Sequence, residues 1–432
     1  MKRGSMATFA DQEQQAQNIP GMAVALLREG EQAEYGCGRL EPGGQPVTAD
    51  TVFGTASVTK SFTALAIMIL QAEGKLSAGD RIVSHLPELK DVPGIGLAQI
   101  RHLLSHTAGV PPLARKEELD RFEDHFDYLN RTEIEPLGRP GEKLSYSNDS
   151  FLLLGAIIGR ASGMDYREFI RERILLPAGM KRTSFDPPAQ GASGNVAVQF
   201  VEENERMKAV DWPALGNYAV GGGIRSTVRD LMNYLKLYID GEYREKVLGV
   251  RVEAEEMWKD PHPVNRHSGY GFGLSVSPDF HGRLIVHHGG SQPGVSSAIG
   301  FLPEEKIAAA VLTNRSDCSA DTVLHGLLNI GLGLDPADEA FTEPEHEMDG
   351  KELSAFEGIY RNDENPEGFE IRIGGTGPEM IVGNVSDRLR ASGPKTLVNI
   401  RTNKTIEFEF GEDGKTTAFS GMRIYWKDAG KQ

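Results

Sequence analysis

Ser57-Val58-Thr59-Lys60-Ser61 leads directly into the apolar run Phe62-Thr-Ala-Leu-Ala-Ile-Met-Ile-Leu70. The run has the length and composition of a buried helix. Ser57 is then expected in the first turn of that helix, with Lys60 one turn later on the same face. Unpaired backbone N–H groups and the positive end of the helix dipole lie beside a hydroxyl at that position. Apolar surroundings push the amine towards its neutral, basic form, so the stretch predicts an activated serine nucleophile.

The S-x-x-K spacing alone leaves a second interpretation open. Ser57 can equally be a plain helix N-cap next to a solvated Lys60. The same spacing recurs at Ser392-Gly393-Pro394-Lys395, where glycine and proline predict a turn. Only the copy at Ser57 opens a predicted buried helix.

The bulk composition excludes several function classes. The chain has 432 residues, 39% hydrophobic and 25% charged, which is typical of a soluble globular protein. A formal charge of −16 argues against nucleic acid or an anionic membrane as partner. Cys37 and Cys318 are too few for a disulfide framework or a Cys-rich metal site.

No membrane span or secretory signal is predicted. The apolar run after Lys60 has nine residues, short of the roughly 20 that a bilayer needs. The basic residues within Met1–Met6 have no apolar segment after them, so we expect a cytoplasmic protein; a mature secreted form that had lost its signal would have the same sequence features.

The order of strands and helices predicts an α+β domain over residues 7–334. We expect strands at 19–27 and before Gly38, and again at 270–277, 283–288, 296–302 and 307–313. Between them lie helices at 57–74, 97–105, 165–176 and 226–240, one beginning at Phe151, and Ser226 as the cap of the 226–240 helix. Strands at both ends that enclose a helical middle indicate one sheet built from both segments.

The remaining chain predicts a linker and a second domain. Residues 335–350 are acidic, contain two prolines and lack an apolar period, which indicates a linker. Residues 351–432 contain about eight short alternating segments, with a hairpin turn at 411–414. A small antiparallel β-barrel is the simplest way to close them.

Two further motifs carry side chains suited to catalysis. Tyr146-Ser147-Asn148 precedes the buried helix that begins at Phe151, so a tyrosine near Lys60 and a carbonyl-binding amide are expected there. The alternative is a half-buried aromatic with a satisfied hydroxyl. A second Y-x-N, Tyr128-Leu-Asn130, lies in a charged stretch with no turn after it.

His287-His288-Gly289-Gly290-Ser291 is expected at the end of a strand. Its glycines would let a substrate backbone approach closely. The N–H groups of Ser291 and Ser57 would form two donors for one oxyanion. The alternative is a glycine-rich hairpin with incidental histidines.

The three motifs, in this order and at these distances, resemble those of the penicillin-recognising serine hydrolases. These are class C β-lactamases, serine DD-carboxypeptidases, D-aminopeptidases and related esterases. Supporting stretches across residues 10–330 are Ile19-Pro-Gly-Met-Ala-Val24, Phe53-Gly-Thr-Ala-Ser57, Leu103-Leu-Ser-His-Thr-Ala-Gly109 and Gly222-Gly-Ile-Arg-Ser-Thr227.

The resemblance implies an antiparallel sheet flanked by helices, an all-helical lobe, and an active site between them. The tail at 351–432 resembles the lipocalin-like barrel of some D-aminopeptidase-type relatives. The implied catalytic residues are Ser57, Lys60 and Tyr146. The implied substrate and oxyanion residues are Asn148, His288, Gly290 and Ser291. No cofactor and no metal are implied.

One position departs from the class C β-lactamase pattern. His288 stands where a lysine begins Lys-Thr-Gly, and an imidazole attracts a substrate carboxylate less firmly than an ammonium does. Val295 replaces the usual aromatic after Gly294. We therefore expect acyl transfer on D-amino-acid peptides or amides, with a short peptide or small molecule as partner. An esterase, a weak β-lactamase or a non-catalytic penicillin-binding sensor remain alternatives.

Two rival hydrolase types fit the sequence less well. A Ser-His-Asp enzyme would need a G-x-S-x-G elbow, and none is present. His102 and His106 have the i,i+4 spacing of zinc ligands, but no H-E-x-x-H completes the set. These two histidines are expected to bond backbone near a helix end instead.

Overall fold

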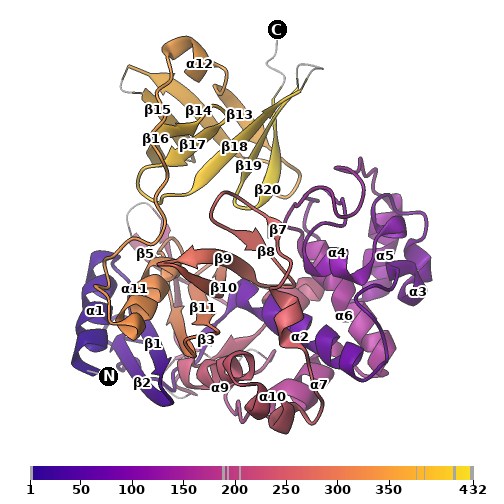
Figure 1. Cartoon of the computed structure of the whole chain (residues 1–432), viewed down its shortest axis with the longest axis vertical. Helices are drawn as coiled ribbons and strands as arrows, with labels where there is room; N and C mark the ends of the chain where they lie inside the picture. Colours follow the sequence, from indigo (N-terminus) through magenta and orange to yellow (C-terminus); the bar gives the residue numbers. More distant parts are fainter. Residues whose placement is uncertain are drawn as a thin grey trace.

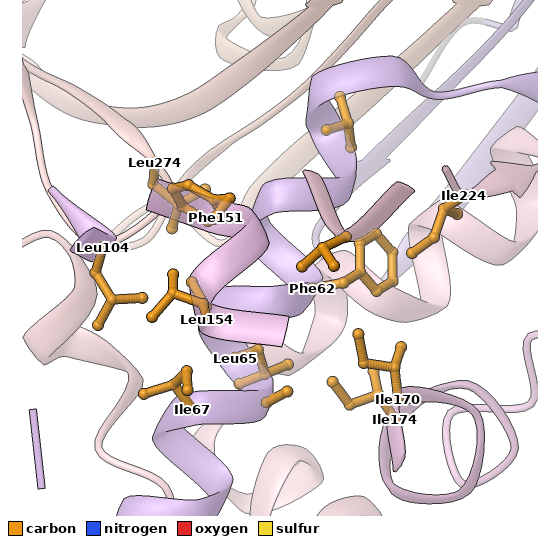
Figure 2. Packing of buried hydrophobic residues seen from close by; sticks show 14 of the residues in the cluster. Phe62, Leu65, Ile67, Leu104, Phe151, Leu154, Ile170, Ile174, Ile224 and Leu274 are labelled. Atoms are coloured by element: carbon orange, nitrogen blue, oxygen red, sulfur yellow. The ribbon is translucent and has the colours of Figure 1, made fainter. Parts of the chain in front are cut away.

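The apolar run after Lys60 forms helix α2 (Thr59–Ala72) at the centre of the core. Every residue from Thr59 to Leu70 is buried. Phe62 and Leu65 lie among side chains from several other elements, such as Leu154, Ile174 and Leu274 (Figure 2). A helix apolar on all sides requires this complete cover.

The α-helix begins two residues later than predicted. Ser57 lies in a 3-10 turn (Ala56–Val58) that leads into α2, rather than in the helix itself. Ala56 has a φ of +44°, outside the helical region, and the backbone after it first forms a 3-10 turn, so the α-helix begins only at Thr59. In this computed structural model the described residues are 3–186, 190–191, 194–203, 206–375, 377–383, 385–411 and 415–428. The turn predicted at 411–414 lies largely outside them.

An eight-stranded antiparallel sheet joins the two ends of the first domain, as predicted. Its order is β2-β1-β12-β11-β10-β9-β8-β7. The strands are β1 (Gly21–Arg28), β2 (Glu31–Gly38), β7 (His262–Pro263), β8 (Gly269–Tyr270), β9 (Ser275–Phe280), β10 (Arg283–Gln292), β11 (Val295–Leu302) and β12 (Ile307–Thr313). Val24 of β1 pairs with Val311 of β12.

Both faces of the sheet are covered by helices (Figure 1). Along β12, Ala308 and Ala310 belong to the core around α2, whereas Ala309 and Val311 belong to a second core. This second core contains residues of α1 (Arg3–Ala16) and α11 (Ala320–Leu332), two helices that the sequence did not predict. Cover on both sides explains why β11 and β12 are apolar without clear alternation.

The helical lobe and its connections occupy the middle of the chain. They comprise α3 (Ile82–His85), α4 (Ile100–Leu104), α5 (Phe122–Arg131), α6 (Asn148–Ser162), α7 (Tyr166–Ile170) and α8 (Ala219–Gly222). The next two helices are α9 (Val228–Ile239), which packs on β1, β11 and β12 of the sheet, and α10 (Gly241–Leu248), which packs on α9. Short strand pairs are β3 (Phe53–Gly54) with β6 (Arg225–Ser226), and β4 (Gln199–Glu203) with β5 (Arg206–Val210).

Three predicted elements differ in detail. The 97–105 helix is shorter, since only α4 forms there, and the 165–176 helix divides into α7 and a wider π turn, Arg171–Leu175. The cap of α9 is Thr227, whose hydroxyl accepts from Asp230 N–H, and not Ser226. Ser226 belongs to strand β6 instead, which fixes its backbone before the helix begins.

The C-terminal segment closes into an eight-stranded antiparallel barrel, as predicted. After α12 (Gly350–Ser354) come β13 (Gly358–Arg361), β14 (Phe369–Gly374), β15 (Gly377–Val382), β16 (Val385–Gly393), β17 (Thr396–Asn399), β18 (Thr405–Phe410), β19 (Thr416–Ser420) and β20 (Arg423–Lys427). Phe356, Tyr360 and Phe408 fill its interior. The domain limits at 334 and 350 stay a prediction.

The barrel rests on the first domain beside the β7–β8 hairpin (Figure 1). Tyr146 N–H donates to the Met422 carbonyl at 2.7 Å, and Phe419 and Met422 pack against the buried cluster of Leu144, Tyr146 and Tyr270. Among the described residues, no helix is long and apolar enough to span a bilayer.

Candidate active site

Ser57 is held between helix α2 and strand β10. The 3-10 turn that carries it follows β3 and packs against β10 at Gly290. A Cβ on Gly290 would lie 2.3 Å from the Thr55 carbonyl oxygen and 3.1 Å from the Ser57 nitrogen. Glycine is therefore required for this close approach of two backbones.

The Lys60 amine lies fully buried beside the Ser57 hydroxyl. Its Nζ is 3.5 Å from Ser57 Oγ, 2.9 Å from Asn148 Oδ1 and 3.1 Å from the Gly221 carbonyl oxygen. A neutral amine has two N–H donors and one lone pair. Two donors suffice for Asn148 and Gly221, which leaves the lone pair for the hydroxyl proton of Ser57.

The environment of Lys60 favours the neutral amine. Burial lowers its pKa well below the usual 10.5, and the positive charges of Arg423 and Arg115 lower it further. The carboxylate of Glu364 acts in the opposite direction. The arrangement is therefore that of a base near the hydroxyl.

Tyr146 and Asn148 reach the site from the segment that begins helix α6. Ser147 caps this helix by accepting a hydrogen bond from the Ser150 N–H. The Tyr146 phenol lies close enough to the Ser57 hydroxyl for Ser57 to influence its pKa. Burial raises the pKa of Tyr146 to about 12, although the Ser57 contact and the charge of Arg423 act to lower it. Lys60 Nζ lies 4.8 Å from the centre of the Tyr146 ring.

His288 is buried and neutral. Its ring nitrogens lie 2.6 Å from the Gly289 carbonyl oxygen and 2.9 Å from the Tyr270 hydroxyl. Nδ1 must therefore donate to the carbonyl, and Nε2 accepts from Tyr270. Burial, followed by the charge of Lys60, lowers the pKa of His288 to about 3. This residue offers no positive charge at neutral pH.

The motif that contains His288 forms the end of strand β10, as predicted, and the strand is longer than the expected 283–288. β10 extends to Gln292, because Gly290 pairs with Ser297 and Ser291 with Ser296 across to β11. The pairing with β11 continues through Gly289 and Gly290, so Ser291 is also part of the strand. It directly follows Gly290, the residue that contacts the turn of Ser57. The structure thus gathers all seven predicted site residues around this turn and the adjoining end of β10.

The competing motifs lie elsewhere. Tyr128 and Asn130 belong to helix α5, and Ser392 to barrel strand β16.

His102 Nδ1 accepts the Gln99 N–H and His106 Nδ1 accepts the Ser147 N–H, as expected of histidines near a helix end. His106 follows the end of α4, so the two do not share a helical face. Within the described part of the chain, no cluster of three or more His, Cys, Asp or Glu residues could hold a metal.

Three charged residues near the site were not predicted. Glu364, between β13 and β14, accepts a hydrogen bond of 2.8 Å from Asn148 Nδ2. Arg423, at the start of β20, forms an ion pair of 2.6 Å with Glu364. Arg115 stacks over the Tyr218 ring at 4.7 Å. No motif marks these residues, and two of them come from the barrel.

The chain is similar to several known proteins. A family model described as Beta-lactamase matches residues 6–327. Penicillin-binding protein 4* of Bacillus subtilis (strain 168) is 26% identical over 405 residues, which cover 85% of each protein. The octameric penicillin-binding protein homologue from Pyrococcus abyssi is 27% identical, with a TM-score of 0.71 over 99% of this chain and 100% of that one. SurE with D-Leu shares the fold, with a TM-score of 0.74 at 22% identity over 99% of both chains.

Proposed function

The chain belongs to the beta-lactamase family and is a serine hydrolase, and from that premise we propose that it hydrolyses peptides or amides that contain D-amino acids. Ser57 is the nucleophile, and Lys60 with Tyr146 is the base. Asn148 orients the substrate, and the strand at Gly290 and Ser291, which also carries the buried His288, borders the reacting carbonyl.

One observation carries the proposal: the hydroxyl of Ser57 lies 3.5 Å from the buried Lys60 amine. The N–H groups of this amine are directed to Asn148 and Gly221. The hydroxyl also lies near the phenol of Tyr146 and influences its pKa. A serine beside a buried, neutral amine is the arrangement that nucleophilic acyl transfer needs.

The reaction proceeds in two steps. Ser57 Oγ attacks the substrate carbonyl while its proton passes to Lys60 or Tyr146, and the same proton then goes to the departing amine. The N–H groups of Ser57 and Ser291 stabilise the oxyanion, which is typically worth about 3 kcal/mol per donor. Water next attacks the acyl-enzyme, and the base takes its proton and returns it to Ser57.

The substrate class rests on two supports. Relatives named for penicillin binding favour amide carbonyls, because penicillin itself is a cyclic amide. SurE, which shares the fold, has a structure with D-Leu, and this favours the D configuration. The neutral His288 supplies no cation for the carboxylate of a β-lactam, so slow β-lactam hydrolysis is expected.

The test compares wild type with Ser57→Ala on matched D- and L-amino-acid p-nitroanilides, a p-nitrophenyl ester and nitrocefin. We expect Ser57-dependent turnover that is fastest on the D-amides. Turnover of the ester alone would assign an esterase, and preference for nitrocefin a β-lactamase. A stoichiometric acyl adduct on Ser57 without release would assign a sensor, and equal rates in Ser57→Ala would overturn the proposal.

A further inference from the structure

Arg423 reaches the catalytic residues from the far end of the chain. It follows the two-residue turn Gly421–Met422, which joins β19 to β20, with Ser420 paired to Arg423. Both turn residues have positive φ, +55° and +62°. Hairpins of this kind match the twist of the strands, but a methionine there is strained. The Met422 carbonyl accepts the Tyr146 N–H at 2.7 Å, so the strained turn is fastened to the catalytic segment.

The guanidinium of Arg423 lies against the same phenol as the Lys60 amine. Its central carbon is 4.6 Å from the centre of the Tyr146 ring, and Lys60 Nζ is 4.8 Å from that centre. The Arg423 side chain is only 24% exposed. A guanidinium stays charged at every working pH, so Arg423 places a fixed positive charge beside both basic groups.

Glu364 holds this charge in place. Its carboxylate accepts from Arg423 Nε at 2.6 Å and Nη2 at 3.2 Å, and from Asn148 Nδ2 at 2.8 Å. The Oδ1 of Asn148 in turn accepts from Lys60. A continuous chain of hydrogen bonds therefore runs from the barrel through Glu364 and Asn148 to the Lys60 amine.

We propose that Arg423 is a positioning residue of the hydrolytic site, which acts through Tyr146 and Lys60 to keep both able to take the Ser57 proton. A nearby positive charge disfavours the ammonium form of Lys60 by repulsion, and it favours the phenolate form of Tyr146 by attraction. Both effects have the direction that a general base needs. This inference rests on the proposed hydrolytic function.

The other charges around the pair do not replace Arg423. The titratable or charged groups that surround Lys60 and Tyr146 are His106, Arg115, Tyr270, His288, Glu364 and Arg423. Burial lowers the pKa of both histidines, so they are neutral above mildly acidic pH, and burial raises the pKa of Tyr270. Arg115 forms an ion pair of 2.8 Å with Glu117, which partly compensates its positive charge. The negative charge of Glu364 raises the pKa of Lys60, whereas the positive charge of Arg423 lowers it. Removal of either charge is therefore predicted to shift the pKa of Lys60 in opposite directions.

The experiment uses the full chain and measures kcat/KM against pH, together with the rate at which a fluorophosphonate modifies Ser57. Arg423→Gln should move the acidic limb of both profiles to higher pH by about half a unit or more, because the amine and phenol lose their proton less readily. Arg423→Lys should restore most of the shift. Glu364→Gln should move the limb in the opposite direction, to lower pH.

Lys143→Gln is the matched control. Lys143 forms an exposed ion pair of 3.1 Å with Glu409 across the same interface between the domains, so its profile should equal that of the wild type. A uniform loss at all pH values in Arg423→Gln, or no change, would overturn the inference. If Arg423→Gln does not fold, the Glu364→Gln variant tests the inference instead. A shift of its acidic limb to lower pH supports the inference, and a shift to higher pH contradicts it. Wild type without Ser57-dependent reaction would instead refute the proposed function itself.

Discussion

At the scale of single residues, the central feature is Lys60, because its surroundings in the folded protein favour the neutral amine over the usual ammonium form. Lys60 has no exposed surface, and it is surrounded by the rings of Tyr146 and Phe151 and by hydrogen-bond acceptors. An ammonium would need a counter-charge to remain stable there. The two guanidiniums nearby favour the neutral form instead.

The pH dependence of hydrolysis follows from this environment. The base is active when deprotonated, so kcat/KM should rise with pH through the pKa of Lys60 and level off above it. Because that pKa is lowered, the midpoint should lie well below 10.5. His288, with a pKa of about 3, adds no step near neutral pH. A rise centred near the value of free lysine, measured on the p-nitrophenyl ester, would contradict this.

Tyr270 provides a test of the neutral His288. Its hydroxyl is buried and donates to His288 Nε2 at 2.9 Å, so Tyr270→Phe leaves a buried acceptor unsatisfied. We expect the free energy of unfolding, measured in urea, to fall by about 1–3 kcal/mol. Tyr128→Phe, which removes a half-buried hydroxyl from the Ala114 carbonyl, is the control and should cost less. Equal losses in the two variants would contradict the assigned hydrogen bond.

At the scale of elements, the site exists because a 3-10 turn and a strand approach more closely than side chains permit. The turn that carries Ser57 meets β10 where Gly290 lacks a Cβ. Ser297, on the neighbouring strand, donates its hydroxyl proton to the Thr55 carbonyl at 2.7 Å. The sheet thus fixes the position of Ser57, and helix α2 fixes the position of Lys60.

Gly290→Ala should therefore separate these elements. Its Cβ would meet the Thr55 carbonyl oxygen at 2.3 Å and Ser297 Oγ at 2.4 Å. A displacement of the turn by about 1 Å should slow fluorophosphonate labelling of Ser57 by about 100-fold. Gly350→Ala, with open space around its Cβ position, is the control. Labelling at the wild-type rate in Gly290→Ala would show that the approach is not needed.

The elements also show what the sequence could predict. Ser57 and Lys60 are three residues apart, so local geometry predicts their contact. The apolar pattern predicts the sheet and the barrel because their strands alternate or are buried throughout. Helix α1 has a mostly polar sequence, and it forms by packing Met6, Phe9 and Ala10 against the second core. No local pattern reveals such a contact.

At the scale of the whole molecule, the barrel completes the site. Asn148 and Glu364 are 216 positions apart, and nothing in the strand pattern around Glu364 or Arg423 indicates that they approach Ser57. The contact arises only when two domains dock, so sequence reasoning could propose the barrel and an influence on the cleft, but not where the barrel lies or which of its residues reach the site. The barrel covers Tyr146 with the backbone of Met422 and the side chain of Phe419.

Deletion of residues 345–432 should lower kcat/KM by at least about tenfold and change substrate preference, because Tyr146 loses its cover and its tether to Met422. Circular dichroism and a thermal melt establish that the remaining domain is folded. Kinetics equal to those of the full chain in a folded truncation would remove the barrel from the site.

The most direct test of the account is the protonation state of Lys60. Nitrogen NMR of protein labelled at lysine side chains, with Lys60 assigned by comparison with Lys60→Arg, reports that state. We predict an amine that gains its proton only at a pH well below 10.5, because burial and the nearby guanidiniums lower its pKa. An ammonium signal that titrates near 10.5 would contradict the account, because Lys60 could not then accept the Ser57 proton.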